Sequence, residues 1–282
     1  MRSRTKTTAT ALAAATLLGA GVSACVPGGG PGRAAQAGRE ARAQASPTPS
    51  GTAPAPARSG AGPLADRSGQ EILTQAYAAT RSAGSAHVTA RVDYQGKPMR
   101  IDLSLDKKGN CNGAVRLDGM GKLDIIKSSE LVHFRGDAAY WRGAAKQRNT
   151  PQKQTEQMVT ALADRWVKIP VSDPRAASMT GSCDLDKLTG DFGKGSPLAR
   201  KGESTTVDGK PALAVTSPAR QGTQTDYVAT EGKPYVLKSA VSGESTGEAL
   251  FSDFDVPVDT TSPQDSDVLD LSKIGGPAGE AI

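Results

Sequence analysis

The chain has 282 residues and is poor in aromatic side chains, which make up 4% of it. Its net charge of +5 is unevenly distributed: residues 1–24 hold three basic residues and no acid, and residues 26–65 hold four arginines and one acid. Residues 66–282 therefore have a net charge of −1. Because domains that bind nucleic acids carry a basic surface, this balance argues against a nucleic-acid partner.

Residues 1–24 have the pattern of a cleavable secretory signal. Three basic side chains precede an uncharged run rich in alanine and leucine, and two small residues follow it. The apolar run is shorter than the about 20 residues that a membrane-spanning helix needs. The string Val22-Ser23-Ala24-Cys25 resembles the bacterial lipobox, which implies that Cys25 is lipidated and begins the mature chain. The alternative is an ordinary signal-peptidase site beside a chance cysteine.

Residues 25–65 are predicted to form a lipidated, disordered tether. Proline, glycine, alanine, serine, threonine and arginine dominate this stretch, so it cannot bury enough apolar surface to offset chain entropy. Two or more acyl chains on Cys25 would hold the protein on a bilayer. We therefore expect a lipid-anchored protein on the extracytoplasmic face of the cell membrane.

Two further cysteines, Cys111 and Cys183, remain if Cys25 carries lipid. An even pair in an oxidising compartment most simply forms a disulfide, and two separate buried thiols are the alternative. The sequence contains no Cys-x-x-Cys and no histidine-rich spacing, so we predict neither a metal site nor a cofactor.

The folded domain is predicted over residues 66–262, followed by a flexible tail over residues 263–282. Ser68 and Glu71 form a capping box at the start of a helix that Gly84 can close. Apolar and polar residues then alternate over 88–94 and again over 99–105, which predicts a hairpin with one apolar face.

Shorter elements complete the domain. The prediction is three more strands, a helical middle, and a second group of strands. The first strands are expected at 111–117, 123–127 and 131–134; the helices at 155–165, from Asp173-Pro174 and after Cys183; and the later strands at 205–207, 212–216, 225–229, 235–241 and 248–254. Strands, then helices, then strands indicate an α+β domain with an antiparallel sheet.

Several late segments resemble one family of lipoproteins. The segments are RWVKIP at 165–170, VDGKPA at 207–212, GKPY at 232–235 and FSDFDVPV at 251–258. Their order resembles the LppX/LprG family of actinobacterial envelope lipoproteins, whose fold is similar to LolA and LolB. The resemblance implies a strongly curved antiparallel sheet, a half-barrel, with helices covering its concave face. It also implies a non-enzymatic protein that holds a lipid or glycolipid between sheet and helices.

The resemblance suggests where a cavity wall would lie. Its candidate residues are Val88, Val92, Met99, Ile101, Leu103, Trp166 and Leu237. An apolar sheet face that its helices do not fill would leave a groove for hydrocarbon. The alternative is an interaction or sensory domain of the same fold with a filled core. We expect a monomer in either case.

One string is typical of a hydrolase. Residues 243–247 read Gly-Glu-Ser-Thr-Gly, which matches the nucleophile elbow G-x-S-x-G. That motif needs a strand before it, a helix after it and a later histidine. Both histidines, His87 and His133, precede Ser245, and a strand is expected after it. We therefore predict no catalytic residue.

Overall fold

The structure, a computed structural model, describes residues 64–273 except residues 95, 182, 191, 194, 221 and 245. The side chains at positions 94 and 177–179 are also left undescribed. The predictions for the signal, for Cys25 and for the tether up to residue 63 lie outside the described residues.

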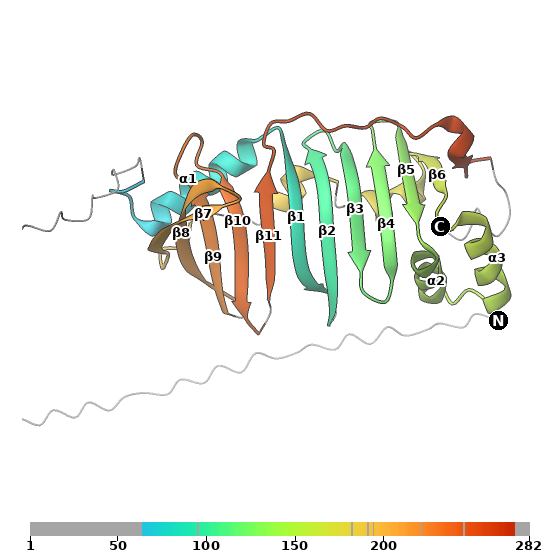
Figure 1. Cartoon of the computed structure of the whole chain (residues 1–282), viewed down its shortest axis with the longest axis horizontal. Coiled ribbons are helices and arrows are strands. Elements are labelled where there is room, and N and C mark those ends of the chain that lie inside the picture. Colours follow the sequence, from blue (N-terminus) through green and yellow to red (C-terminus); the bar gives the residue numbers. More distant parts are fainter. Residues whose placement is uncertain are drawn as a thin grey trace, which may run out of the picture. The chain divides into compact units, whose positions relative to one another are not determined.

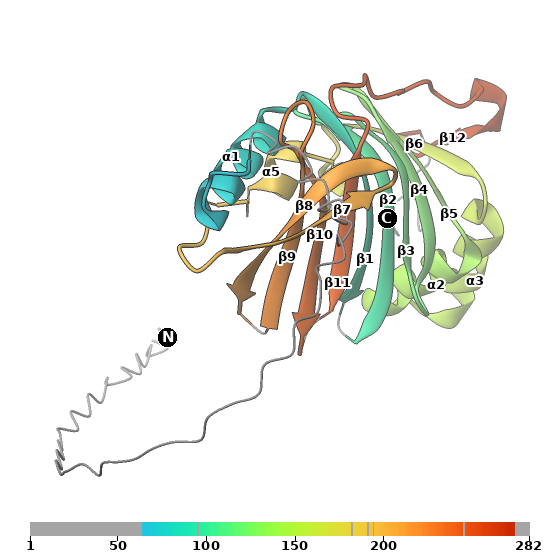
Figure 2. The same ribbon diagram turned by 60° about the vertical axis from the view of Figure 1, so that its left-hand side comes forward.

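A single twelve-stranded sheet runs through the described domain and curves around its helices (Figures 1 and 2). The strand order is β12-β6-β5-β4-β3-β2-β1-β11-β10-β9-β8-β7, and neighbours pair antiparallel except β12 with β6. This confirms the predicted α+β class and the curved antiparallel sheet. The strands are β1 Ser85–Tyr94, β2 Lys97–Asp106, β3 Cys111–Leu117, β4 Gly121–Lys127, β5 Leu131–Gly136, β6 Trp166–Pro170, β7 Arg200–Val207, β8 Lys210–Ala219, β9 Gly222–Ala229, β10 Val236–Gly243, β11 Gly247–Ser252 and β12 Val268–Asp270.

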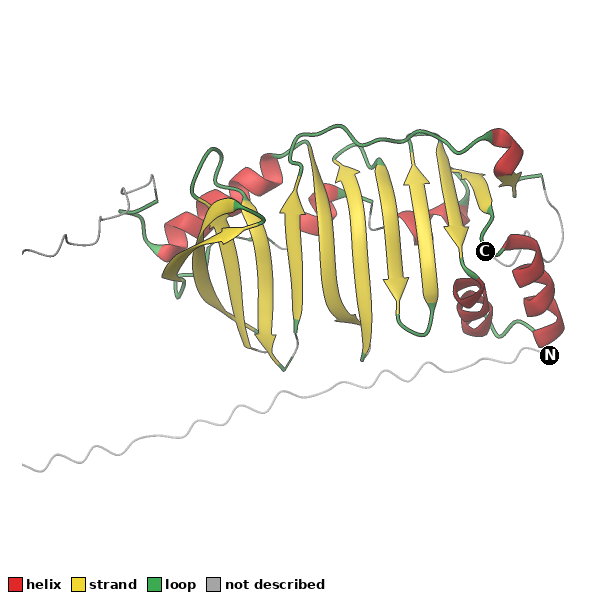
Figure 3. Cartoon of the chain, viewed as in Figure 1, coloured by secondary structure: helices red, strands yellow, loops and turns green. Residues whose placement is uncertain are grey.

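The helices lie on the concave face of the sheet, as Figure 3 shows by colour. They are α1 Gly69–Ser82, α2 Ala138–Gln147, α3 Gln152–Leu162, α4 Pro174–Thr180 and α5 Leu185–Thr189, with a short 3-10 turn, η1, at Asp265–Asp267. Helix α1 packs against β7–β10, whereas α2 packs against β4 and β5. The central strands β1, β2 and β11 therefore lie between the two parts of the sheet that α1 and α2 cover.

Helix α1 begins at the predicted capping box. The Ser68 hydroxyl accepts a hydrogen bond from the backbone N–H of Glu71, and the Glu71 carboxylate accepts one from the backbone N–H of Ser68 at 2.7 Å. These bonds satisfy two donors that a helix start leaves free. The helix then buries one apolar face against the sheet, formed by Ile72, Leu73, Ala76 and Tyr77.

Helix α2 was not predicted. It begins after Asp137, whose carboxylate accepts a hydrogen bond from the backbone N–H of Tyr140 at 2.7 Å. Its Trp141 is almost fully buried and donates its indole N–H to the carbonyl of Leu162 at the end of α3. Trp141 also packs against Phe134 of β5. Large side chains therefore fill this end of the concave face.

The prediction of a flexible tail from residue 263 is wrong for the part that the structure describes. Residues 268–270 form β12, which pairs in parallel with β6, and Leu271 is buried in the main core. Leu64, placed in the tether by the sequence, is also buried in that core. Leu64 is isolated among polar and small residues, and the apolar residues of 268–271 form too short a run to give a periodic pattern.

Asp255 ties the end of β11 to the start of β1. Its carboxylate accepts hydrogen bonds from the backbone N–H of Gly84 at 2.7 Å and from the Tyr235 hydroxyl at 2.8 Å, and it pairs with Lys233 at 3.1 Å. The Gly84 bond, followed by the Tyr235 and Lys233 contacts, lowers the pKa of Asp255 to about 2. The ionised carboxylate thus stabilises the folded state.

We predict that Asp255→Asn lowers the melting temperature at pH 7 by about 2–4 °C, for a loss of roughly 1 kcal/mol at this partly exposed site. The pKa of Asp255 lies below its unfolded value, so the stabilisation is complete above about pH 4 and fades as the pH falls toward 2. Thermal unfolding of both proteins across this range checks the prediction. A gap that stays constant down to pH 2 would contradict a charge-dependent contact.

Candidate functional site

A row of four side chains, the middle two of them alanines, crosses the centre of the concave face. In register, Ile101 of β2 lies opposite Ala90 of β1, Ala90 opposite Ala249 of β11, and Ala249 opposite Ser239 of β10. Side chains directly opposed on neighbouring strands lie about 5 Å apart, so these residues form one continuous floor. The middle of this floor consists of the methyl groups of Ala90 and Ala249, which project only a short distance from the sheet.

An apolar groove of about 460 Å³ lies above this floor. Ligand pockets have volumes of about 300–1,000 Å³, so the groove is large enough for a small ligand. Aliphatic side chains and two phenyl rings form most of its lining, which also includes Asp93, Ser239, Thr246 and Glu248. The wall residues nearest the core are Val88, Leu103, Leu105 and Phe251.

Leu188 of α5 and Phe192, which follows α5, form the roof of the groove. The Phe192 ring stacks on Tyr77 of α1 at 5.0 Å between centroids and contacts the Phe251 ring of β11 at 5.6 Å. Leu188 is 39% exposed although it is apolar. The roof therefore presents hydrocarbon to an incompletely filled space.

A disulfide joins Cys111, the first residue of β3, to Cys183, two residues before α5. This is the pairing that the sequence predicted. Both cysteines are buried, and so is the adjoining Leu185 of α5. The bond thereby holds the segment that carries Leu188 and Phe192 against the sheet.

A buried polar network closes the groove beside Ser239. Asp226 of β9 is fully buried and accepts hydrogen bonds from the Tyr77 hydroxyl at 2.6 Å and from the Gln224 amide at 2.9 Å. The Gln224 amide also lies 3.4 Å from the Ser239 hydroxyl. Burial, followed by the charge of Asp226, raises the pKa of the Tyr77 hydroxyl. The neutral phenol therefore remains a donor that ties α1 to β9.

The structure brings four of the seven predicted wall residues together. Val88, Val92, Ile101 and Leu103 all line the groove. Met99 lies further along β2, in a cleft at the rim.

The other two predicted wall residues lie elsewhere, so that part of the prediction is wrong. Trp166 faces the outer side of the sheet under the Arg135 guanidinium, 4.8 Å from the ring centroid, whereas its neighbour Val167 faces the core. Leu237 belongs to a small second apolar cluster. A β-bulge between Val236 and Lys238 shifts the alternation of β10 and turns Leu237 away from the groove.

The residues that the sequence did not identify are the ones that create the space. Ala90 and Ala249 form the floor, and Leu188 and Phe192 form the roof. Alanine in an alternating strand marks the buried face but does not reveal that its cross-strand neighbour is also small. That information comes only from the register of β1 with β11.

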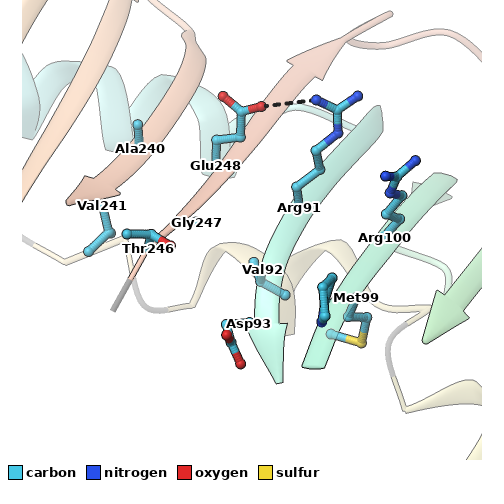
Figure 4. Close-up of a pocket in the computed structure, with 11 residues that line it drawn as sticks. Arg91, Val92, Asp93, Met99, Arg100, Ala240, Val241, Thr246, Gly247 and Glu248 are labelled. Carbon is cyan, nitrogen blue, oxygen red and sulfur yellow. Dashed lines mark ion pairs between the residues drawn. The ribbon is translucent and has the colours of Figure 1, made fainter. Parts of the chain in front are cut away.

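A cleft of about 470 Å³ adjoins the groove at the rim, between the β1–β2 and β10–β11 hairpins (Figure 4). Arg91 and Arg100 line it, and Glu248 pairs with Arg91 at 3.8 Å. Glu248 also binds Lys238 at 2.7 Å, and this contact is the main cause that lowers the pKa of Glu248. Val92 and Gly247 line both the cleft and the groove, so the two spaces adjoin at these residues.

The hydrolase string lies between two antiparallel strands. β10 ends at Gly243 and β11 begins at Gly247, so no helix follows the motif; Ser245 itself lies outside the described residues. Within residues 64–273, as far as they are described, no group of three metal-binding side chains occurs. No helix in that part of the chain is long and apolar enough to cross a membrane.

No protein-family model matches the sequence, and no curated protein matches it. Solved structures, in contrast, match the fold of this chain. The Mycobacterium tuberculosis lipoprotein LppX is 13% identical, with 68% of this chain and 98% of LppX covered and a TM-score of 0.43. LprF from Mycobacterium bovis is 12% identical, with 69% and 96% covered and a TM-score of 0.48.

MucB of Pseudomonas aeruginosa, solved in complex with MucA, is 12% identical, with 70% of this chain and 59% of that chain covered and a TM-score of 0.30. The chain is similar in structure to LppX and LprF. Because these identities and TM-scores are low, we draw the function from the groove of this chain and not from its neighbours.

We predict that the double variant Cys111→Ser/Cys183→Ser melts about 10 °C lower than the wild type. The bond spans 72 residues, and closing such a loop is worth roughly 4 kcal/mol in the chain-entropy account. Thermal unfolding followed by circular dichroism measures the drop. Reductant should lower the wild-type melting temperature equally and leave the double variant unchanged; a wild type that is insensitive to reductant would contradict the prediction.

Proposed function

We propose that this chain is a membrane-anchored lipoprotein that binds an acyl chain in the groove on its concave face. The observation that carries the proposal is an apolar space of about 460 Å³ over a floor of two alanines. Helices fill both ends of the concave face but not its centre. A filled interior, which a purely structural interaction domain would have, does not fit this arrangement.

The energetics favour hydrocarbon as the occupant. Burial of about fourteen methylene groups contributes roughly 11 kcal/mol. Association costs at least about 4 kcal/mol, which leaves a dissociation constant in the range of about 10 μM. No catalytic group is needed for such binding, and the groove walls offer chiefly aliphatic contacts. The ligand is therefore carried or presented without being altered.

The anchoring half of the proposal rests on the N-terminal pattern and on the disulfide. Residues 1–25 read as a secretory signal ending in a lipobox, and a basic, proline-rich stretch follows. A structural disulfide between Cys111 and Cys183 fits an oxidising compartment outside the cytoplasm. We place the domain on the extracytoplasmic face of the membrane, held by lipid on Cys25.

We predict that Ala249→Phe weakens binding of a fluorescent long-chain acyl probe by at least about tenfold, because the phenyl ring would occupy the space above the floor. The control is Thr89→Phe, which adds the same ring on the opposite face of the neighbouring strand β1. Titration of the purified, delipidated protein measures both affinities.

Thr89→Phe should bind the probe as the wild type does, and both variants should melt cooperatively. If Ala249→Phe folds and binds the probe with unchanged affinity, the acyl chain does not occupy this groove. Absence of any probe binding to the delipidated wild type would likewise contradict the proposal.

We predict that Cys25→Ala moves the protein from the membrane pellet to the soluble fraction, because no other hydrocarbon anchor is expected. Fractionation of cells that express the wild type or the variant checks this outcome. Cys111→Ala/Cys183→Ala serves as the control and should stay in the pellet. A Cys25→Ala chain that sediments with membranes as firmly as the wild type would refute lipid anchoring.

A further inference from the structure

We infer that the ligand of the groove is an anionic amphiphile whose head group is held by Arg91 and Arg100. This inference rests on the proposed function, because it assumes that an acyl chain lies in the groove. It adds the chemical class of the head group, a carboxylate or a phosphate, and the side chains that recognise it.

Arg91 and Arg100 are direct cross-strand partners on β1 and β2. Like charges placed opposite each other on neighbouring strands destabilise the pair unless an anion lies between or above them. Figure 4 shows both side chains extending toward the same side of the cleft. Two neighbouring guanidinium groups can donate several hydrogen bonds to the oxygens of one carboxylate or phosphate.

The anions already present do not neutralise this pair. Arg91 meets Glu248 at 3.8 Å with its side chain 72% exposed, and Glu248 is held more closely by Lys238 at 2.7 Å. Arg100 forms no ion pair with another residue that the structure describes. Arg91 and Lys238 therefore share the Glu248 carboxylate, and Arg100 has no carboxylate of its own among the described residues.

Two nearby aspartates are directed elsewhere. Asp102 follows Arg100 on β2, and its carboxylate lies 2.8 Å from the His87 ring. Asp93 lines the cleft, but Figure 4 shows it at the end opposite the two guanidinium groups. The end of the cleft that carries Arg91 and Arg100 is therefore available to an added anion.

The cleft adjoins the groove at the rim of the sheet. Val92, Val241, Thr246 and Gly247 line both spaces, at the point where the β1–β2 and β10–β11 hairpins separate. A chain lying over Ala90 would leave the groove at this rim. Arg91 and Arg100 follow and precede Ala90 and Ile101 in the strand alternation, so their side chains leave the opposite face of the sheet. The head group would therefore pass around the rim to the outer face to reach the arginines, while its hydrocarbon stayed on the alanine floor.

The experiment compares three probes that separate the head group from the chain. Palmitate carries the chain and an anion, 1-hexadecanol carries the same chain without charge, and inorganic phosphate is an anion without a chain. Each probe competes with a fluorescent acyl reporter on the purified, delipidated protein. The variants are Arg100→Gln and the control Arg81→Gln, which changes an exposed arginine in the last turn of α1, outside the cleft.

The wild type should bind palmitate at least about fivefold more tightly than 1-hexadecanol, as expected for a partly exposed charge pair. Arg100→Gln should abolish that preference and leave 1-hexadecanol binding unchanged, whereas Arg81→Gln should keep the preference. Millimolar phosphate should not displace the reporter.

Equal affinity for palmitate and 1-hexadecanol in the wild type would overturn the head-group site while leaving the acyl groove intact. So would a preference that survives in Arg100→Gln. Phosphate that binds alone with palmitate-like affinity, and loses it in Arg100→Gln, would instead mark a free-anion site and also overturn the inference. If neither chain-bearing probe binds, the acyl groove fails first and the head-group site fails with it.

Discussion

The groove depends on one constraint, the register that places Ala90 opposite Ala249 at the centre of the sheet. On either side of this pair the concave face carries valine, leucine and phenylalanine, which the helices bury. Two adjacent methyl groups leave a gap that no helix enters among the described residues. A shift of one residue in either strand would turn these alanines outward and bring Thr89 or Leu250 onto the floor. The space for a ligand is thus a property of strand pairing.

The covering segment is held by covalent and aromatic contacts and not by a long helix. α5 has only five residues, too few to be stable alone. The Cys111–Cys183 bond fixes its start, and the ring contacts of Phe192 with Tyr77 and Phe251 fix the chain after it. Leu188 lies between these two attachments and remains partly exposed. An arrangement of this kind can hold the roof in place and still let it yield to hydrocarbon.

Local sequence patterns predicted the helices and strands that are specified by residues close together in the chain. The Ser68 capping box predicted α1, and alternation predicted β1 and β2. The strands predicted at 205–207 and 212–216 are joined by a tight turn at Asp208-Gly209, where both residues have positive φ. β12 could not be predicted, because three residues gain their structure only by pairing with β6. The site was predictable only in part. Alternation identified Val88 and Leu103 correctly, but the prediction for Leu237 failed because the bulge in β10 interrupts the alternation there.

A crystal structure with a fatty acid brominated near the middle of its chain tests the central claim most directly, because anomalous scattering locates the bromine without reference to the protein. The account predicts one bromine position above Ala90 and Ala249, beneath Leu188 and Phe192. The account would be contradicted if bromine were found only on the outer face of the sheet. It would also be contradicted if the groove were empty while the fatty acid was bound elsewhere on the protein.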